Sequence, residues 1–306
     1  MKYSILGAGA MGTVFGARLH LAGFEVELLN RSPHQSEAIK AHGLDATIDG
    51  NQYTLDVPAT VVENASPADV VIIFTKSFQI QEALSQMPPA LQSAPVATLQ
   101  NGLGNGQQVA ELIGIERTIE GVSMMPAQYI QHGKVVSWDA AQTWLYHASG
   151  EADPVANQMG LDFNKAGIAT TVTPEVHHYI WQKACFNIAM NALCALTNGS
   201  PGMMSAFPDG QVLAHEIADE AMKIAKASDA NLNSDKVHGL IDYACTNHLK
   251  HKPSMLQDLD HQRLTEIDGL NGYIVDLADQ LGMDAPINRM ITRLVRIREK
   301  APQFWE

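Results

Sequence analysis

The sequence has few cysteines, a shortage of basic residues and no long hydrophobic run. Its three cysteines, Cys185, Cys194 and Cys245, are odd in number, and none belongs to a C-x-x-C pair. This pattern argues against a disulfide framework or a thiolate metal site and is typical of small buried side chains.

Lysine and arginine total 20 against 33 acidic residues, a formal charge of −13. Such a charge repels phosphate backbones and anionic lipids, so no nucleic-acid or membrane partner is expected.

The hydrophobic runs are too short for a transmembrane helix. The longest ones, such as residues 70–74, fall far below the roughly 20 residues that a membrane span needs. Residues 1–6 lead directly into a glycine-rich turn and lack the charged start, long apolar middle and cleavage site of a signal peptide. The sequence therefore predicts a soluble, cytoplasmic protein.

The chain is long enough for two domains that each bury a core. It has 306 residues, of which 46% are hydrophobic and 17% charged, an ordinary globular composition. It contains no internal repeat, low-complexity tract or flexible linker. The two domains are therefore expected to pack together around a cleft, which is a common place for a ligand.

Buried strands alternate with helical stretches in the first part of the sequence. Four apolar runs predict strands, at residues 2–6, 25–29, 70–75 and 96–99. Residues 13–22, between the first two, have helical spacing. Strands separated by helices indicate a parallel sheet covered on both faces. Three shorter runs predict hairpin strands that extend this sheet antiparallel, at 119–125, 133–138 and 143–147.

The strand signal ends after a predicted helix at 154–166 and a strand at 168–172. Four later segments have helical periodicity, at 177–196, 211–227, 235–246 and 254–281. The predicted domains are residues 1–172 and 173–306. The expected fold class is α/β: an N-terminal Rossmann-type sheet, parallel with an antiparallel extension, followed by an all-helical C-terminal domain.

A glycine-rich loop follows the first predicted strand and precedes a helix. Its first glycine permits a tight turn, its second lets the backbone approach a pyrophosphate, and its third lets helix and strand pack closely. The free N–H groups at the helix N-terminus then face the phosphates. The loop residues predicted to bind a dinucleotide are Gly7, Ala8, Gly9, Ala10, Met11 and Gly12.

The end of the second predicted strand indicates which dinucleotide is bound. An acidic residue there holds the ribose 2′-hydroxyl of NAD, whereas an arginine accommodates the 2′-phosphate of NADP. This strand ends in LNRS (29–32), and Glu25 and Glu27 lie too early within it. Arg31 therefore favours NADP, with a solvated loop arginine as the alternative.

A stripe of polar side chains crosses an otherwise hydrophobic helix. Lys183, Asn187 and Asn191 stand four residues apart, so they stack on one face among apolar neighbours. A helix that is hydrophobic nearly all round is buried, which places these groups inside the protein or on a cleft wall. Burial lowers the pKa of a lysine, and a lysine tuned towards neutral pH suits a proton donor. A structural lysine paired with a carboxylate is the alternative.

A carboxylate that could pair with this lysine lies on the predicted helix 254–281. The hydrophobic stripe of that helix is formed by Leu256, Leu259, Ile267, Leu270, Ile274, Leu277 and Leu281. Glu266 lies beside Ile267 and could reach a buried site, although an acid at this place is also compatible with the surface.

Seven features together resemble the ketopantoate reductase (2-dehydropantoate 2-reductase) family. They are GAGAMG (7–12), Arg31, FTKSFQ (74–79), QNGLGN (100–105), WQKACFNIAMN (181–191), PSMLQD (253–258) and TEIDGLNGY (265–273). They span essentially the whole chain in the right order, and although each is loose alone, the set is specific. The resemblance implies NADPH-dependent reduction of 2-dehydropantoate to D-pantoate, on the route to pantothenate and coenzyme A.

The resemblance also implies roles for the matching residues. Lys183 would be the general acid for the carbonyl oxygen, Glu266 would bind the substrate hydroxyl and support the lysine, and Asn101 would contact that lysine and the nicotinamide. The positions that match substrate contacts are Asn187, Asn191, Ser254 and Glu266, with Ser254 towards the carboxylate. Outside the glycine loop, the positions that match cofactor contacts are Arg31, Lys76 and Asn101.

Two histidines precede the predicted helix 254–281. His248 and His251 have a spacing seen in metal sites, but no third ligand is evident, so no metal is predicted. Some relatives carry an asparagine where this chain has His251, three residues before the serine matching Ser254. That departure leaves open a preference for another branched or aromatic 2-oxo acid, as in a D-2-hydroxyacid dehydrogenase.

Two further functions stay open. A β-hydroxyacid dehydrogenase shares the glycine-rich start and a Lys-x-x-x-Asn helix, but it should lack the glutamate of TEID and the PSMLQD segment. An NADP-sensing regulator without chemistry would have lost the catalytic residues, whereas Lys183, Glu266 and Asn101 are all present here.

The expected partner is a small-molecule 2-oxo acid. The oligomeric state, a homodimer included, and the extent of domain closure are left open.

Overall fold

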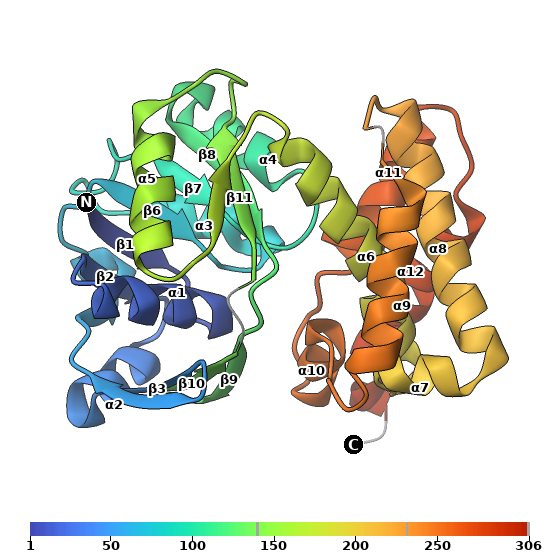
Figure 1. The fold of residues 1–306 in the computed structure, drawn as a ribbon, viewed down its shortest axis with the longest axis horizontal. Coiled ribbons are helices and arrows are strands. Elements are labelled where there is room, and N and C mark those ends of the chain that lie inside the picture. The colour runs from blue at the N-terminus through green and yellow to red at the C-terminus, as the bar shows by residue number, and fades with distance from the viewer. Residues whose placement is uncertain (139–140, 231, 305–306) are drawn as a thin grey trace. The chain divides into compact units, whose positions relative to one another are not determined.

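The computed structural model describes residues 1–138, 141–230 and 232–304, which form two compact units (Figure 1). The first unit consists of Met1–Asn101 and Asn105–Val176. The second consists of Gly102–Gly104 and the chain from His177 onward. Each unit has its own hydrophobic core.

An eight-stranded sheet forms the centre of the first unit. Its order is β12-β11-β8-β7-β6-β1-β2-β5. The strands are β1 (Lys2–Leu6), β2 (Glu25–Asn30), β5 (Ala59–Val61), β6 (Val70–Ile73), β7 (Val96–Thr98), β8 (Thr118–Ser123), β11 (Thr143–His147) and β12 (Thr170–Val172). Neighbours are parallel except β8 and β11, which pair antiparallel. The predicted parallel sheet with an antiparallel extension is therefore confirmed. The strand predicted at 119–125, however, is β8 and lies parallel to β7, so the antiparallel extension begins at β11.

A second, four-stranded sheet corrects one part of the prediction. It contains β3 (Leu44–Ile48), β4 (Asn51–Leu55), β9 (Gln128–Gln131) and β10 (Lys134–Ser137) in the order β4-β3-β10-β9. The predicted strand at 133–138 lies here as β10, parallel to β3, and does not extend the main sheet. Gly133 explains this placement, because its N–H donates to Gln35 Oε1 and its carbonyl accepts from the N–H of Asp45.

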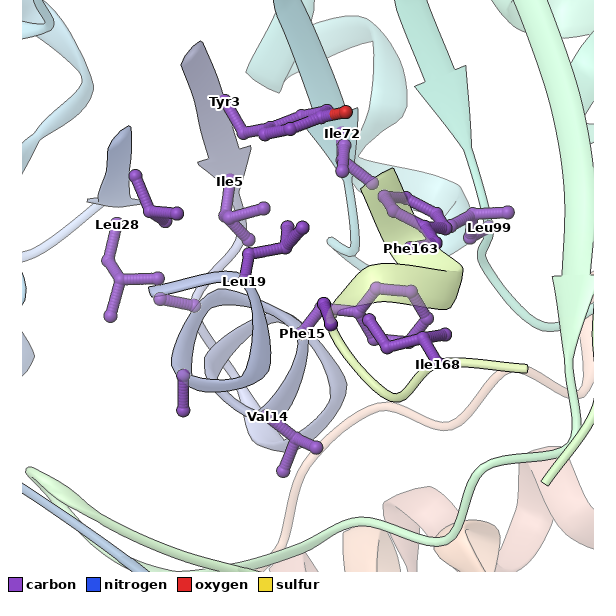
Figure 2. Packing of buried hydrophobic residues seen from close by; sticks show 14 of the residues in the cluster. Tyr3, Ile5, Val14, Phe15, Leu19, Leu28, Ile72, Leu99, Phe163 and Ile168 are labelled. Carbon is purple, nitrogen blue, oxygen red and sulfur yellow. The ribbon is translucent and has the colours of Figure 1, made fainter. Parts of the chain in front are cut away.

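In the described part of the first unit there are five α-helices, and two of them contribute aromatic rings to its core. They are α1 (Ala10–Leu21), α2 (Pro33–His42), α3 (Ile80–Ser85), α4 (Asn105–Ile113) and α5 (Pro154–Lys165). Figure 2 shows Phe15 of α1 meeting Phe163 of α5, edge to face with ring centroids 5.5 Å apart. Phe163 also contacts Tyr3 of β1, and all three rings are fully buried. Burial of one such side chain contributes about 1.5–3 kcal/mol, so this cluster fixes α1 against the sheet.

The second unit is built from helices, as predicted. They are α6 (Val176–Thr197), α7 (Pro201–Ala206), α8 (Pro208–Ala227), α9 (Ser234–Asn247), α10 (Ser254–Asp260), α11 (Tyr273–Gln280) and α12 (Pro286–Lys300). Between residues 184 and 195, α6 is buried everywhere except at the half-buried Phe186. Within the described ranges, no helix is both long and apolar enough to cross a membrane.

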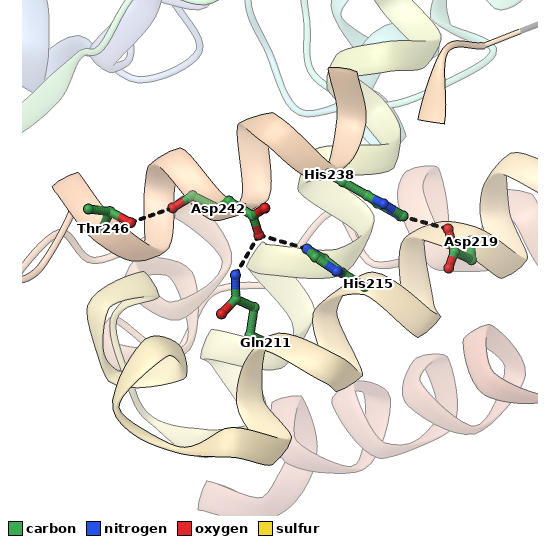
Figure 3. Close-up of polar contacts among 6 residues, drawn as sticks. All are labelled: Gln211, His215, Asp219, His238, Asp242 and Thr246. Carbon is green, nitrogen blue, oxygen red and sulfur yellow. Dashed lines mark hydrogen bonds and ion pairs between the residues drawn. The ribbon is translucent and has the colours of Figure 1, made fainter. Parts of the chain in front are cut away.

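A cluster of polar side chains joins α8 to α9 (Figure 3). The ring of His215 stacks on that of His238, with centroids 4.3 Å apart and planes at 9°. Asp242 lies 2.8 Å from His215 Nε2 and accepts a hydrogen bond from Gln211, while Asp219 lies 2.7 Å from His238 Nε2. These contacts cross-link the two helices, and we assign the cluster a structural role.

The predicted continuous helix at 254–281 was wrong. Helix α10 ends at Asp260, and helical structure resumes only with a π-helical turn at Asp268–Gly272, which leads into α11. In the intervening segment, residues 261–267, Gln262 has a positive φ of 52°. The N–H of Thr265 donates to the Glu299 carboxylate of α12 at 2.8 Å, instead of to a carbonyl of its own helix. Glu266 therefore lies outside a helix.

Candidate active site

The glycine-rich loop between β1 and α1 has the shape that a pyrophosphate requires. A Cβ on Gly7, whose φ is +97°, would lie 2.6 Å from Thr75 N, and one on Gly12 would lie 2.3 Å from the Gly7 oxygen. Side chains are therefore excluded at both positions. Nothing lies within 4 Å of the corresponding point on Gly9, the N-cap of α1, and Gly9 is exposed. The helix thus presents its first N–H groups towards open space, which fits an anionic group.

Hydrogen-bond donors gather where β2 ends and α2 begins. Arg31 is exposed (69%), and its Nη1 lies 3.8 Å from the Glu82 carboxylate, an ion pair too exposed to be strong. Asn30 is buried, and within the described residues its Nδ2 has no hydrogen-bond partner. Ser32 is the N-cap of α2, yet its side chain makes no capping bond. These donors suit a phosphate at this end of the strand.

The residues that follow β6 and β7 lie at the same edge of the sheet as the glycine loop. The sheet order β7-β6-β1-β2 places the carboxyl ends of four adjacent parallel strands side by side. Lys76 follows β6 and Asn101 follows β7, and Gln100 links the two loops by donating to the Thr75 carbonyl at 2.6 Å. The structure thus brings the predicted cofactor positions of the first unit to one edge. Gln100, which the motif QNGLGN contains, was missed as a positioning residue.

Helix α6 carries Lys183 on the same face as two buried asparagines. Asn187 and Asn191 are both buried, and Lys183 is partly buried. Burial lowers the pKa of Lys183 to about 8, and the negative charge of Glu266 acts in the opposite direction. The sequence predicted this lowering from the apolar surroundings, and a pKa in this range suits a proton donor near neutral pH. The role of Lys183 as that donor stays a prediction.

Glu266 is buried (8% exposed) and is held close to α6 by the turn that follows it. In that turn, Asn271 Nδ2 donates to the Ile188 carbonyl of α6 at 3.1 Å, next to Asn187. The Coulombic interaction of Glu266 with Lys183 shows that the carboxylate and the ammonium lie within electrostatic reach. The non-helical segment, and not the predicted hydrophobic stripe, thus brings the acid to the lysine.

The remaining predicted substrate position also lies beside α6. Ser254 is the first residue of α10, and its hydroxyl accepts a long hydrogen bond of 3.5 Å from Asn191 Nδ2. The second unit therefore gathers the polar stripe of α6, Ser254 and Glu266. Asn101 belongs to the first unit, so its contact with Lys183 stays a prediction. Among the residues that the structure describes, no group of three His, Cys, Asp or Glu side chains could hold a metal ion.

A dinucleotide loop on a Rossmann-type sheet, together with a titratable lysine in a helical unit, defines the class of dinucleotide-dependent oxidoreductases. The family model described as ketopantoate reductase PanE/ApbA matches residues 3–150, and the model of its C-terminal part matches residues 175–299. The chain belongs to the ketopantoate reductase family. Its members are oxidoreductases that act on small keto acids.

Individual relatives are similar over nearly the full length. The 2-dehydropantoate 2-reductases of Streptococcus pyogenes and Pyrococcus horikoshii are each 31% identical over 302 residues, 98% of both chains. A ketopantoate reductase family structure from Ralstonia eutropha has a TM-score of 0.90 at 30% identity, covering 99% of this chain and 100% of that one. D-mandelate dehydrogenase with NADH and anilino(oxo)acetate has a TM-score of 0.92 at 27% identity, covering 98% and 99%.

Proposed function

We propose that this protein reduces 2-dehydropantoate to D-pantoate with NADPH, on the route to pantothenate and coenzyme A, and that Lys183 is the general acid. The observation that carries the proposal is the state of Lys183 in a chain of this family. Burial lowers the pKa of this lysine to about 8, and the lysine lies within electrostatic reach of the buried Glu266. The relatives named 2-dehydropantoate 2-reductase support this substrate.

The first unit would hold the cofactor, which would supply the hydride for the 2-oxo carbon. The loop Gly7–Gly12 and the N-terminus of α1 would bind the pyrophosphate, because Gly9 leaves the approach open. Lys76 would add a positive charge at the same edge, and Arg31 would hold the 2′-phosphate. Asn101 would orient the nicotinamide end.

The second unit would supply the proton and hold the substrate. When a carbonyl carbon accepts a hydride, negative charge develops on its oxygen, and the Lys183 ammonium would stabilise that charge and transfer its proton. Glu266 would accept a hydrogen bond from the substrate hydroxyl and keep Lys183 charged. The positions proposed to bind the rest of the substrate are Asn187, Asn191 and Ser254, with Ser254 on the carboxylate.

Reduction of an aromatic or another branched 2-oxo acid is a second candidate function. It is favoured by the fold similarity to D-mandelate dehydrogenase, whose complex contains anilino(oxo)acetate. His251, three residues before Ser254, is exposed and differs from the asparagine of some relatives, so it adds to this candidate.

A substrate panel separates the candidate functions. We expect kcat/KM with NADPH to be at least about tenfold higher for 2-dehydropantoate than for 2-oxoisovalerate or phenylglyoxylate. Differences in pocket contacts discriminate between substrates by about 1–3 kcal/mol, which is enough for this ratio. The loss of NADPH absorbance measures the rates. A preference for phenylglyoxylate would establish the second candidate. Oxidation of 3-hydroxy acids alone would indicate a β-hydroxyacid dehydrogenase, and NADPH binding without turnover would indicate a regulator.

Replacing Arg31 with alanine is expected to reduce the preference for NADPH over NADH by about tenfold or more, because a charge-assisted bond to phosphate contributes roughly 1.5–3 kcal/mol. The ratio of kcat/KM for the two cofactors measures this effect. Lys40→Ala removes the same charge from the other end of α2 and is the matched control. An unchanged ratio in Arg31→Ala would assign the 2′-phosphate to another residue.

A further inference from the structure

The last turns of α12 hold the chain on both sides of Glu266. The Glu299 carboxylate accepts hydrogen bonds from the N–H and the hydroxyl of Thr265, at 2.8 and 2.6 Å. Arg296 donates to the Asp268 carboxylate through Nε at 2.9 Å and pairs with it through Nη2 at 2.7 Å. Arg296 and Glu299 are three residues apart, so they share one face of α12. One helix face therefore binds the residue before Glu266 and the second residue after it.

The two contacts differ in strength. The side chains of Arg296 and Asp268 are 52% and 70% exposed, so water screens this pair and it contributes little. Thr265 is only 4% exposed, and both of its donors bind one oxygen of a carboxylate. Bonds to an ionised acceptor are stronger than neutral ones, and burial strengthens them further. Glu299 is therefore the dominant contact.

Thr265 extends this constraint across Glu266 to the residue that follows it. Its hydroxyl donates to Glu299 and also accepts a bond of 3.2 Å from the N–H of Ile267. The Thr265 side chain thus bridges the Glu299 carboxylate and the peptide link that follows Glu266.

Helix α12 is itself fixed to α6, which carries Lys183. Arg298 donates to the Ala195 carbonyl near the end of α6. Asn288 Oδ1 accepts from Asn271 Nδ2 at 2.9 Å, and the same Nδ2 donates to the Ile188 carbonyl of α6. A displacement of the segment from α12 would therefore also be a displacement of Glu266 relative to Lys183.

We propose that Glu299 is a positioning residue that acts through Thr265 to hold the Glu266 carboxylate at its place near Lys183. This inference rests on the proposed function, in which Glu266 supports the lysine and binds substrate. A small displacement of a group that orients substrate is enough to lower turnover strongly.

A double-mutant cycle tests whether Glu299 acts through Glu266. We expect Glu299→Ala to lower kcat/KM for the 2-oxo acid by about tenfold to a hundredfold with unchanged NADPH affinity. Glu299→Gln keeps an oxygen acceptor and should recover most of the loss. In a Glu266→Gln background, Glu299→Ala should have almost no further effect, since the residue that it positions is already changed. If the double variant lost kcat/KM by the product of the two single losses, the two residues would act independently and the proposal would be overturned.

Control variants separate positioning from general stability. Arg289 lies on α12 as Glu299 does, but near the other end of the helix, and it pairs with Asp279 of α11. Arg289→Gln breaks that ion pair and should leave kcat/KM unchanged. If Glu299→Ala folds poorly, Thr265→Val removes only the hydroxyl contacts and should lower kcat/KM several-fold, while Thr265→Ser should restore it. A Glu299→Ala protein that has a lower Tm but wild-type kcat and KM would contradict the proposal.

A measurement that needs no turnover distinguishes failure of this proposal from failure of the proposed function. The pH dependence of Lys183 modification by an amine-reactive reagent, followed by mass spectrometry, reports the pKa of Lys183. Because the charge of Glu266 raises that pKa, Glu299→Ala should lower it, and Arg289→Gln should not. An unchanged pKa in Glu299→Ala would overturn the positioning role. If the wild-type protein reduced no 2-oxo acid, the proposed function would fail, while a lowered pKa would still support the positioning.

Discussion

Replacing Lys183 with alanine is expected to lower kcat for 2-oxo acid reduction by a factor of about 10²–10⁴, the usual contribution of a general acid. The proton that Lys183 would transfer is needed only as charge develops on the carbonyl oxygen, so its removal affects the transition state more than ground-state binding. NADPH affinity should stay nearly unchanged, because the proposed cofactor contacts lie on the edge of the sheet in the first unit.

Two measurements are needed for this variant. Single-turnover rates at saturating substrate give the effect on chemistry, and an NADPH titration gives the dissociation constant. Lys236→Ala removes an exposed lysine from α9 and is the matched control for the charge change. A Lys183→Ala protein that had lost NADPH binding but retained its rate of chemistry would show that Lys183 holds the cofactor and does not donate the proton.

Lys183 is expected to lower the stability of the folded protein relative to a variant with an uncharged side chain at this position. The folded-state pKa of Lys183 lies below that of an exposed lysine, so the folded state disfavours the ammonium form. This cost is fully present below about pH 8, declines as the pH rises from there towards the ordinary lysine pKa of 10.5, and is absent above it. Lys183→Met, which keeps the length without the charge, should therefore have a higher Tm than the wild-type protein at neutral pH, as is common for functional residues.

Local sequence signals were sufficient for the parts of the site whose geometry is local. The glycine loop lies between a strand and a helix, and its spacing alone determines where backbone must approach backbone. The stripe of Lys183, Asn187 and Asn191 follows from helical periodicity, and the apolar neighbours correctly indicated burial of the helix. In both cases, the residues that decide the structure lie within one or two turns of each other.

Contacts between distant residues account for what could not be predicted. The apolar spacing around Ile267 continues across 261–267, so periodicity alone favoured one long helix, but Thr265 binds Glu299, 34 residues later. The strand at 133–138 was placed in the wrong sheet for the same reason, because Gln35 and Asp45 hold Gly133 from almost a hundred residues away. Glu299 carries no motif of its own, and no pattern in the sequence marked it.

Replacing Glu266 with glutamine is expected to lower kcat/KM by about a hundredfold and to move the pH profile of reduction. In the proposed mechanism, the variant loses the charged acceptor of a hydrogen bond from the substrate hydroxyl. Such a loss costs roughly 2–3 kcal/mol, which corresponds to about a hundredfold in kcat/KM. Since the proposed mechanism uses the ammonium form of Lys183, the wild-type rate should be constant below about pH 8 and fall as the pH rises above it.

The direction of the shift in the profile follows from the charges. Burial lowers the pKa of Lys183 and Glu266 raises it, so glutamine at position 266 leaves burial to act alone and the pKa falls further. The decline in the reduction rate should then begin at a lower pH. The oxidation of the 2-hydroxy acid, for which the proposed mechanism uses the neutral amine, should begin to rise at a lower pH. Asp276→Asn removes an exposed acid from α11 and should leave both profiles unchanged. A Glu266→Gln profile that still declined from about pH 8 would mean that the Glu266 carboxylate does not set the charge of Lys183 during turnover.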